Sequence, residues 1–171
     1  MIGICLLLIL IIIILLAFIA YLNAYNSLII SKIKMDNSYK NIKEDLDKKF
    51  ELMNKLSNQI KKAIKKKNYL KEFFELKKEK LNIYELDIEL QKHLLTMITL
   101  KDDFKDLNND DFNNIVNEIN LLNQKLTANK KFFNSQNNIL MKKIRGYYKF
   151  VAKINNIKIK TSFEIKEPKT L

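Results

Sequence analysis

From Ile4 to Arg145 the chain contains neither glycine nor proline. These residues are the two strongest helix breakers, so their absence over such a distance favours long, uninterrupted helices. The two glycines, Gly3 and Gly146, and the single proline, Pro168, lie outside this stretch. The sequence therefore predicts an all-α protein.

The N-terminal run is strongly apolar: no residue before Lys32 is charged, and most of the first 22 are leucine or isoleucine. At about 1.5 Å per residue, about 20 apolar residues cross the roughly 30 Å hydrocarbon layer of a bilayer. We therefore expect residues 2–22 to contact lipid and residues 1–24 to form a transmembrane anchor. A cleaved signal peptide is the rival interpretation, but no basic residue precedes the run, and large apolar residues occupy the second recognition position before each candidate alanine.

Basic residues lie on one side of this anchor only. Lys32, Lys34, Lys40 and Lys43 follow it, and nothing basic precedes it. The positive-inside rule then predicts a single-pass protein of the cell membrane, with its N-terminus outside and its C-terminal domain in the cytoplasm. Cys5, the single cysteine, has no partner for an internal disulfide and is interpreted as a small apolar residue in lipid.

After the anchor, apolar residues recur at steps of three or four, as on one face of a helix. The first series continues from the anchor without a break and consists of Met35, Tyr39, Ile42, Leu46, Phe50, Met53, Leu56, Ile60 and Ile64. Further helices are predicted at 69–81 and 84–104, with Leu107 closing the latter. The last helix is expected to begin near Asn108, Asn109 or Asp110 and to end at Gly146, with a stripe of Phe112, Ile115, Ile119, Leu122, Leu126, Phe133, Leu140, Ile144 and Tyr147.

None of these helices can bury its apolar stripe alone. We therefore expect the transmembrane helix to continue into an antiparallel three- or four-helix bundle spanning residues 25–148. Residues 149–171 are predicted to form a C-terminal tail that is partly extended or disordered. Six phenylalanines at helical spacings are expected in the core, namely Phe73, Phe74, Phe104, Phe112, Phe132 and Phe133.

Several short motifs, taken in order with the anchor, resemble the LemA family of bacterial membrane proteins. They are Tyr25-Asn26, the step at Asn37, the run Lys48-Lys49 with Leu52 and Leu56, and Phe133-Asn134. Asn54 stands where the family has a proline, so no kink is expected there. The resemblance implies an antiparallel helical bundle on a membrane-anchored helix, and the family has no established molecular activity. It also suggests that Asn134 and Asn137, beside the last apolar stripe, find hydrogen-bond partners near Tyr25-Asn26.

Catalytic and cofactor motifs are not evident in the sequence. His93 is the single histidine and Cys5 lies in the apolar run, so neither an ordinary zinc site nor a Cys-His nucleophile is expected. Acidic clusters around Asp45 and Asp102 lie among lysines and are interpreted as exposed ion pairs on helices. We expect no cofactor, no metal and no enzymatic activity.

The formal net charge is +12, with a dense run of lysines from Lys61 to Lys67. A solvated surface is the first interpretation and contact with anionic lipid headgroups the second. Nucleic acid is the least favoured partner, because Arg145 is the single arginine and arginine is the residue best suited to phosphate and base contacts. The expected function is a membrane-anchored, non-enzymatic scaffold or interaction protein whose protein partner is unknown. The alternative is a lysine-rich membrane-surface module that binds anionic lipid or nucleic acid.

Overall fold

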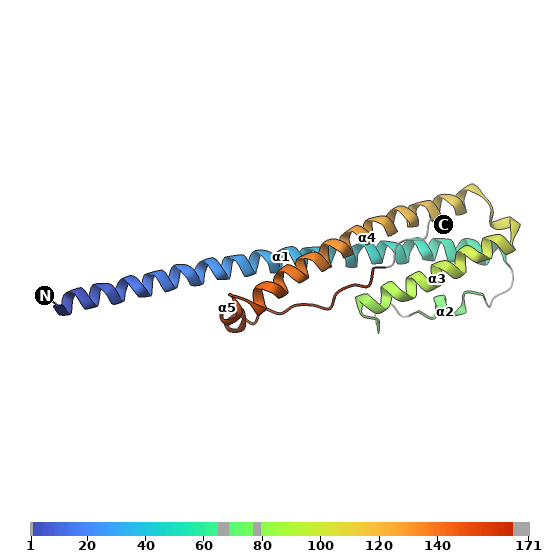
Figure 1. Ribbon diagram of the computed structural model, residues 1–171. Coiled ribbons are helices and arrows are strands. Elements are labelled where there is room, and N and C mark those ends of the chain that lie inside the picture. The colour runs from blue at the N-terminus through green and yellow to red at the C-terminus, as the bar shows by residue number, and fades with distance from the viewer. Residues whose placement is uncertain (1, 65–68, 77–79, 166–171) are drawn as a thin grey trace. The chain divides into compact units, whose positions relative to one another are not determined.

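The computed structural model describes residues 2–64, 69–76 and 80–165 (Figure 1). Within these ranges the chain is helical and contains no strand, which confirms the all-α prediction for the described part. The elements are α1 (Ile2–Ala63), α2 (Lys71–Phe74), α3 (Ile83–Asp103), the short 3₁₀ helix η2 (Lys105–Leu107), α4 (Asp110–Arg145) and α5 (Lys149–Ile154). The run from Lys65 to Asn68 and Pro168 lie outside the described residues.

Helix α1 is one uninterrupted helix of 62 residues, which corresponds to a rise of about 93 Å (Figure 1). It continues from the apolar run into the amphipathic part without a break, as predicted, and it passes through Asn54 as helix. Most of the predicted apolar stripe is buried, and the two aromatic members, Tyr39 and Phe50, are half-buried. The spacing of apolar residues therefore identified the inward face of this helix correctly.

Side-chain caps and a glycine set the bounds of the next long helices. Asn82 begins α3 with a capping box: its side chain accepts hydrogen bonds from the backbone of Tyr84 and Glu85, and Glu85 accepts one from the Asn82 backbone. The Asn109 side chain accepts a hydrogen bond from the Phe112 backbone at 2.9 Å, so Asn109 caps α4, within the predicted start. Helix α4 ends at Arg145, directly before Gly146, as predicted.

The prediction of a helix over 69–81 is wrong for the described part of that segment. In residues 69–76 and 80–81, α-helix is confined to the single turn Lys71–Phe74, and Lys80 has 3₁₀ conformation. The Leu76 backbone N–H then donates to the Phe73 carbonyl, three residues earlier, at 3.1 Å and closes the turn. Leu70 and Phe73 are nevertheless buried. The apolar residues hold this turn in place by burial, without extending it into a regular helix.

The predicted phenylalanine core is partly wrong. Phe73 and Phe133 are buried, whereas their neighbours Phe74 and Phe132 are exposed. Consecutive residues on a helix point about 100° apart, so only one of two adjacent rings can face inward. Tyr147 is also exposed, because it follows the end of α4 and no longer shares the phase of the α4 stripe.

The chain divides into two compact units, and α1 and α4 each contribute to both. Unit 1 comprises residues 1–38 and 132–162, and unit 2 comprises residues 39–131 and 163–171. Buried residues along both shared helices follow a seven-residue repeat, which is typical of helices that pack lengthwise against others. The α1 series is Leu28, Met35, Ile42, Lys49 and Leu56, and the α4 series is Phe112, Ile119, Leu126, Phe133 and Leu140.

In unit 1, the segment after α5 is neither helix nor strand, and Asn137 of α4 holds it in place. The Asn137 amide donates to the Lys160 carbonyl at 2.6 Å and accepts from the Lys160 backbone N–H at 3.1 Å. It also lies 3.3 Å from the Ser162 hydroxyl. The amide thus pairs with the backbone much as a neighbouring strand would. The hypothesis that Asn137 pairs near Tyr25-Asn26 is therefore wrong.

Candidate functional site

The first candidate site is the N-terminal part of α1, where every large apolar side chain from Ile2 to Ile19 is exposed. Within the described ranges, α1 is the helix that is long and apolar enough to cross a membrane, with a mean hydropathy of 3.6 over its most apolar window. None of that window is buried against other parts of the protein. A helix that is apolar on all sides and uncovered is suited to lipid rather than to water.

The helix first becomes covered where the apolar run ends. Ala24 and Leu28 are buried, whereas the residues before them are not. The rings of Tyr21 and Tyr25 stack with centroids 6.4 Å apart and an angle of 10° between their planes. Asn155, at the end of α5, donates a hydrogen bond to the Tyr21 hydroxyl at 3.2 Å. This pair of tyrosines therefore marks the boundary between the bare part of α1 and the packed part of unit 1.

One turn further along α1, a lysine of α4 is bound by neutral oxygen atoms. The Lys143 ammonium donates to the Ser27 carbonyl at 3.1 Å and to the Ser31 hydroxyl at 2.8 Å. Ser31 is buried and also donates to the Ser27 carbonyl. Lys143 lies in the last turn of α4, where the helix dipole favours a positive charge. This contact joins α1 to α4 inside unit 1.

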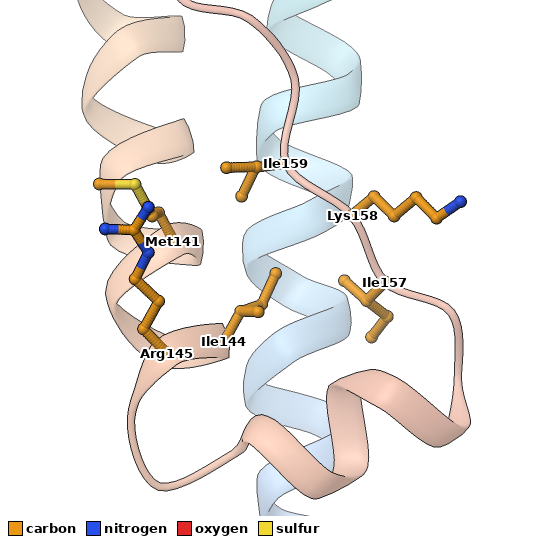
Figure 2. A pocket seen from close by; sticks show the side chains of 6 residues that line it. All are labelled: Met141, Ile144, Arg145, Ile157, Lys158 and Ile159. Carbon is orange, nitrogen blue, oxygen red and sulfur yellow. The ribbon is translucent and has the colours of Figure 1, made fainter.

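Unit 1 also contains an open groove of about 400 Å³ between the end of α4 and the segment after α5 (Figure 2). Its lining residues are Met141, Ile144, Arg145, Ile157, Lys158 and Ile159. A second groove, of about 360 Å³, shares three of these residues and is completed by Lys149, Ala152 and Lys153. Isoleucines and basic residues line both grooves. Such a surface can accept an anion that carries apolar groups.

In unit 2, Asp45 of α1 is buried and paired across helices. Its carboxylate accepts hydrogen bonds from the Lys125 ammonium at 2.6 Å and from the Asn129 amide at 2.8 Å. The prediction of an exposed ion pair along one helix is therefore wrong for Asp45. The reason is its register: Asp45 lies seven residues after Ser38 and fourteen after Ser31, and all three side chains face inward.

A second buried cluster joins α1, α3 and α4 through Lys49, Asp87 and Lys130. The three residues are 1%, 6% and 4% exposed, and the Lys130 ammonium lies 2.5 Å from the Asp87 carboxylate. Burial lowers the pKa of Lys49 to about 8; the negative charge of Asp87 opposes this shift, and the positive charge of Lys130 adds to it. Lys130 is therefore the hydrogen-bonded partner of Asp87, and Lys49 interacts with the same carboxylate electrostatically.

His93 lies on α3 in the same unit and is buried, with its ring edge-on to Phe73 at 5.6 Å between centroids. Its Nε2 atom is 3.6 Å from the Glu89 carboxylate, one turn earlier on the same helix. Burial lowers the pKa of His93, and this effect outweighs the opposing influence of Glu89. The neutral imidazole is the form that this packing favours. Among the described residues, no group of three or more His, Cys, Asp or Glu side chains is placed to hold a metal ion.

The positions that carry the LemA resemblance fall in both units. In unit 1, Phe133 is buried, Tyr25 and Asn134 are half-buried, and Asn26 and Asn37 are exposed. In unit 2, Lys49 and Leu56 are buried, Leu52 is half-buried and Lys48 is exposed. Among these positions, Lys49 is the one whose charged group lies in the buried cluster with Asp87 and Lys130.

Several residues of these sites were missed by the reasoning from sequence. Asp87 and Lys130 were not identified as site residues, although Asp87 directly follows the buried Leu86 and Lys130 lies four positions, about one helical turn, after the buried Leu126. The seven-residue series in α1 contains one charged member, Lys49, and that interruption of an apolar series was the available signal. Comparison with other proteins adds no further assignment: no family model, curated protein or solved structure matches the chain.

Proposed function

We propose that this chain is a single-pass membrane protein whose water-facing part is a non-enzymatic helical scaffold or interaction module of the LemA type. One observation carries the proposal: the bare apolar run of α1 continues, without a break, into a helix with a buried face. A helix of this kind holds its packed part at the bilayer surface. The part of α1 after Leu22 rises about 60 Å, so the scaffold extends well beyond the lipid headgroups.

The orientation that we propose places the N-terminus outside and the packed part in the cytoplasm. Lys32 and Lys34 follow the span in sequence, as the positive-inside rule requires. The fold adds cations from the other end of the chain, because Asn155, directly after α5, is hydrogen-bonded to Tyr21, and α5 carries Lys149 and Lys153. Both sets of cations lie on the same side of the apolar run.

For the packed part, we propose an antiparallel helical bundle that serves as a rigid surface rather than as a catalyst. The ion pairs between α1 and α4 and between α3 and α4 support such packing. In unit 2, the buried Asp45 is hydrogen-bonded to Lys125 and the buried Asp87 to Lys130, and this supports a structural role for both carboxylates. The partner is proposed to be another protein at the membrane surface.

The proposal is tested in native membranes of cells that express the full chain. Alkaline carbonate extraction should leave the protein in the membrane pellet, and protease added to sealed, right-side-out cells should leave the lysine-rich part intact. The same protease should digest that part in inverted vesicles. Recovery of the chain in the soluble fraction contradicts the membrane span, and digestion from outside contradicts the orientation.

A partner search complements this test. A proximity-labelling enzyme fused to the C-terminus of the full chain should label a reproducible set of membrane-proximal cytoplasmic proteins. The matched control is the same enzyme fused to an unrelated single-pass anchor. A labelled set that does not differ from that of the control contradicts the interaction role.

A further inference from the structure

The turn and short helix that follow α4 expose large apolar side chains beside a row of cations. We infer that residues 145–154, named here the α4–α5 corner, form a second membrane-contact site whose ligand is the headgroup layer of an anionic bilayer. This inference rests on the proposed membrane span. It differs from that span because it involves the other end of the chain, far from the apolar run in sequence.

The apolar side chains of the corner point away from the protein. Tyr147 is fully exposed, Phe150 is 72% exposed and Ile154 is 57% exposed, whereas Val151 and Ala152 are buried. Phe150 and Ile154 lie four positions apart on α5, so they share one side of that helix, while the buried residues hold the other side against unit 1. Tyr147 lies in the turn that precedes α5. Clustered exposed apolar residues, aromatic ones especially, are typical of surfaces that enter the interfacial layer of a membrane.

The charge of the corner matches an anionic surface. Arg145, Lys149 and Lys153 lie within it, and Lys158 follows shortly after. No acidic residue occurs in the sequence between Glu118 and Glu164, so no carboxylate from the flanking chain neutralises these cations. In unit 1 as a whole, Asp36 is the single acidic residue, and it is already paired with Lys160 at 2.8 Å. Cations close to a membrane surface are attracted by the phosphates of anionic lipids.

The fold brings the corner to the level at which the apolar run ends. Asn155, immediately after α5, donates its hydrogen bond to Tyr21, which lies at the end of that run. Figure 1 shows α5 beside α1, and Figure 2 shows it crossing α1 on the side of the groove that faces the N-terminus. On the proposed span, this is the headgroup level, where tyrosines are also favoured. A bilayer therefore meets Tyr147, Phe150 and Ile154 without any movement of the chain.

The chain contains no tryptophan, so single substitutions provide depth probes in the full-length protein. F150W reports the corner and F18W reports the proposed span. F132W is the matched control, because Phe132 is also an exposed phenylalanine of unit 1. It lies about 20 Å from Arg145 along α4 and therefore outside the corner. Each variant is reconstituted into bilayers with or without an anionic lipid, and its fluorescence is measured with brominated acyl chains as the quencher.

We expect strong quenching of F18W in both bilayers. Quenching of F150W should be several-fold greater than that of F132W in the anionic bilayer, and weaker in the neutral one. Replacing Lys149 and Lys153 by glutamine in the F150W protein should reduce its quenching. The matched control, K62Q with K131Q, removes the same charge from exposed positions of unit 2 and should not.

The two proposals fail in different ways. Strong quenching of F18W together with equal, weak quenching of F150W and F132W overturns the second contact site and leaves the span intact. Absence of quenching for F18W overturns the span itself. Protection of F150W from both brominated lipid and aqueous acrylamide also overturns the inference, because the corner is then covered by protein.

Discussion

Lys49 carries its ammonium group inside the protein, where burial penalises the charged form. Its pKa of about 8 records that penalty, since the ordinary value is 10.5. Below pH 8 the lysine is charged in both the folded and the unfolded chain, and the penalty is fully present. Between about pH 8 and pH 10.5 the unfolded chain binds more protons than the folded one, so the folded state gains stability as pH rises.

We therefore expect the free energy of unfolding of the full chain in detergent to rise between pH 8 and pH 10.5, by at most about 3 kcal/mol from this group. Urea denaturation followed by circular dichroism measures it. Near pH 10 the raised pKa of Tyr84 opposes this rise in stability, because the Tyr84 hydroxyl then keeps its proton to a higher pH in the folded chain than in the unfolded one. K49M should remove most of the slope, whereas K48M, at the exposed neighbouring position, should retain it. Equal slopes in both variants contradict the assignment.

His93 gives a second pH-dependent contribution, in the acidic range. Burial lowers its pKa below the ordinary value of 6.5, so the folded state resists protonation more than the unfolded one does. The contribution of His93 to stability is therefore present above pH 6.5 and is lost as pH falls below it. H93L should flatten the fall in unfolding free energy below pH 6.5. A fall of the same steepness in H93L and in the unmodified chain shows that carboxylates alone cause it.

The residue scale is also where prediction from sequence was weakest. The adjacent lysines 48 and 49 have the same side chain, yet one is exposed and the other buried. Charge and residue type do not distinguish them; only the seven-residue phase of α1 does. The same phase explains why Asp45 faces inward, although it lies in a charged run that is typical of an exposed helix face.

At the scale of elements, the helices of unit 2 are connected by charged pairs as well as by apolar contacts. Asp87 of α3 is hydrogen-bonded to Lys130 of α4, and its negative charge attracts Lys49 of α1. Removing one partner of a buried pair leaves an unneutralised charge, which typically costs about 3–5 kcal/mol. Such clusters also restrict which residues can lie opposite each other when helices pack.

We expect D87L to destabilise the full chain more than K130M does, because D87L leaves two buried lysines without a nearby carboxylate, whereas K130M still leaves the charge of Lys49 to attract Asp87. The loss for D87L should be about 3–5 kcal/mol. The loss of unfolding free energy in the double variant D87L/K130M should be smaller than the sum of the two single losses. Unfolding free energies of the four proteins form a double-mutant cycle, and strict additivity contradicts a direct interaction.

Asn137 provides an element-scale prediction in unit 1. Replacing it by alanine removes both amide contacts to Lys160, and the backbone N–H of Lys160 should lose its protection from hydrogen exchange. The loss of stability should be about 1–3 kcal/mol. N138A is the control, since Asn138 is the exposed neighbour. Equal exchange at Lys160 in both variants shows that other contacts hold the segment.

Helices that follow a long apolar period were predictable, because one face had to be buried along their whole length. The bounds of α4 also followed from local chemistry, namely an asparagine cap at its start and a glycine after its end. The Asn82 cap that begins α3 was not predicted. Helix α2 was not predictable in the same way. Its single turn is held by the burial of Leu70 and Phe73, and that burial depends on packing against distant parts of the chain.

On the scale of the whole molecule, two long helices connect the two units. Helix α1 passes from unit 1 to unit 2 between Ser38 and Tyr39, and α4 does so between Lys131 and Phe132. Because both helices are continuous there, local unfolding in one unit disturbs hydrogen bonds that the other also uses. We therefore expect the two units to unfold cooperatively.

A proline at the exposed position 40 tests this expectation. K40P removes a backbone hydrogen bond in the interior of α1 and should cost about 3 kcal/mol. It should also divide one thermal transition into two, as followed by circular dichroism. K40A is the control: it retains the helix and loses only the exposed pair with Glu44, whose contribution is small. A single sharp transition in K40P shows that α1 does not couple the units.

Sequence reasoning reached the helical class and the apolar run, because composition and period determine both. The hydrogen bond between Asn155 and Tyr21 connects the α4–α5 corner to the end of the apolar run. No local sequence pattern predicts a contact between residues that are 134 positions apart. The α4–α5 corner could therefore be identified only from the fold, whereas the long helices could be predicted from the sequence.

Helix α1 has no hinge at the place where, on our proposal, it leaves the lipid, since neither glycine nor proline interrupts it there. In a thinner bilayer a transmembrane helix of fixed length tilts, so that its apolar surface stays within the hydrocarbon layer. A stiff rod passes that inclination on to whatever is attached to it. The thickness of the surrounding lipid would thereby set the angle at which, on our proposal, unit 1 is presented at the membrane surface, with no moving joint and no bound ligand.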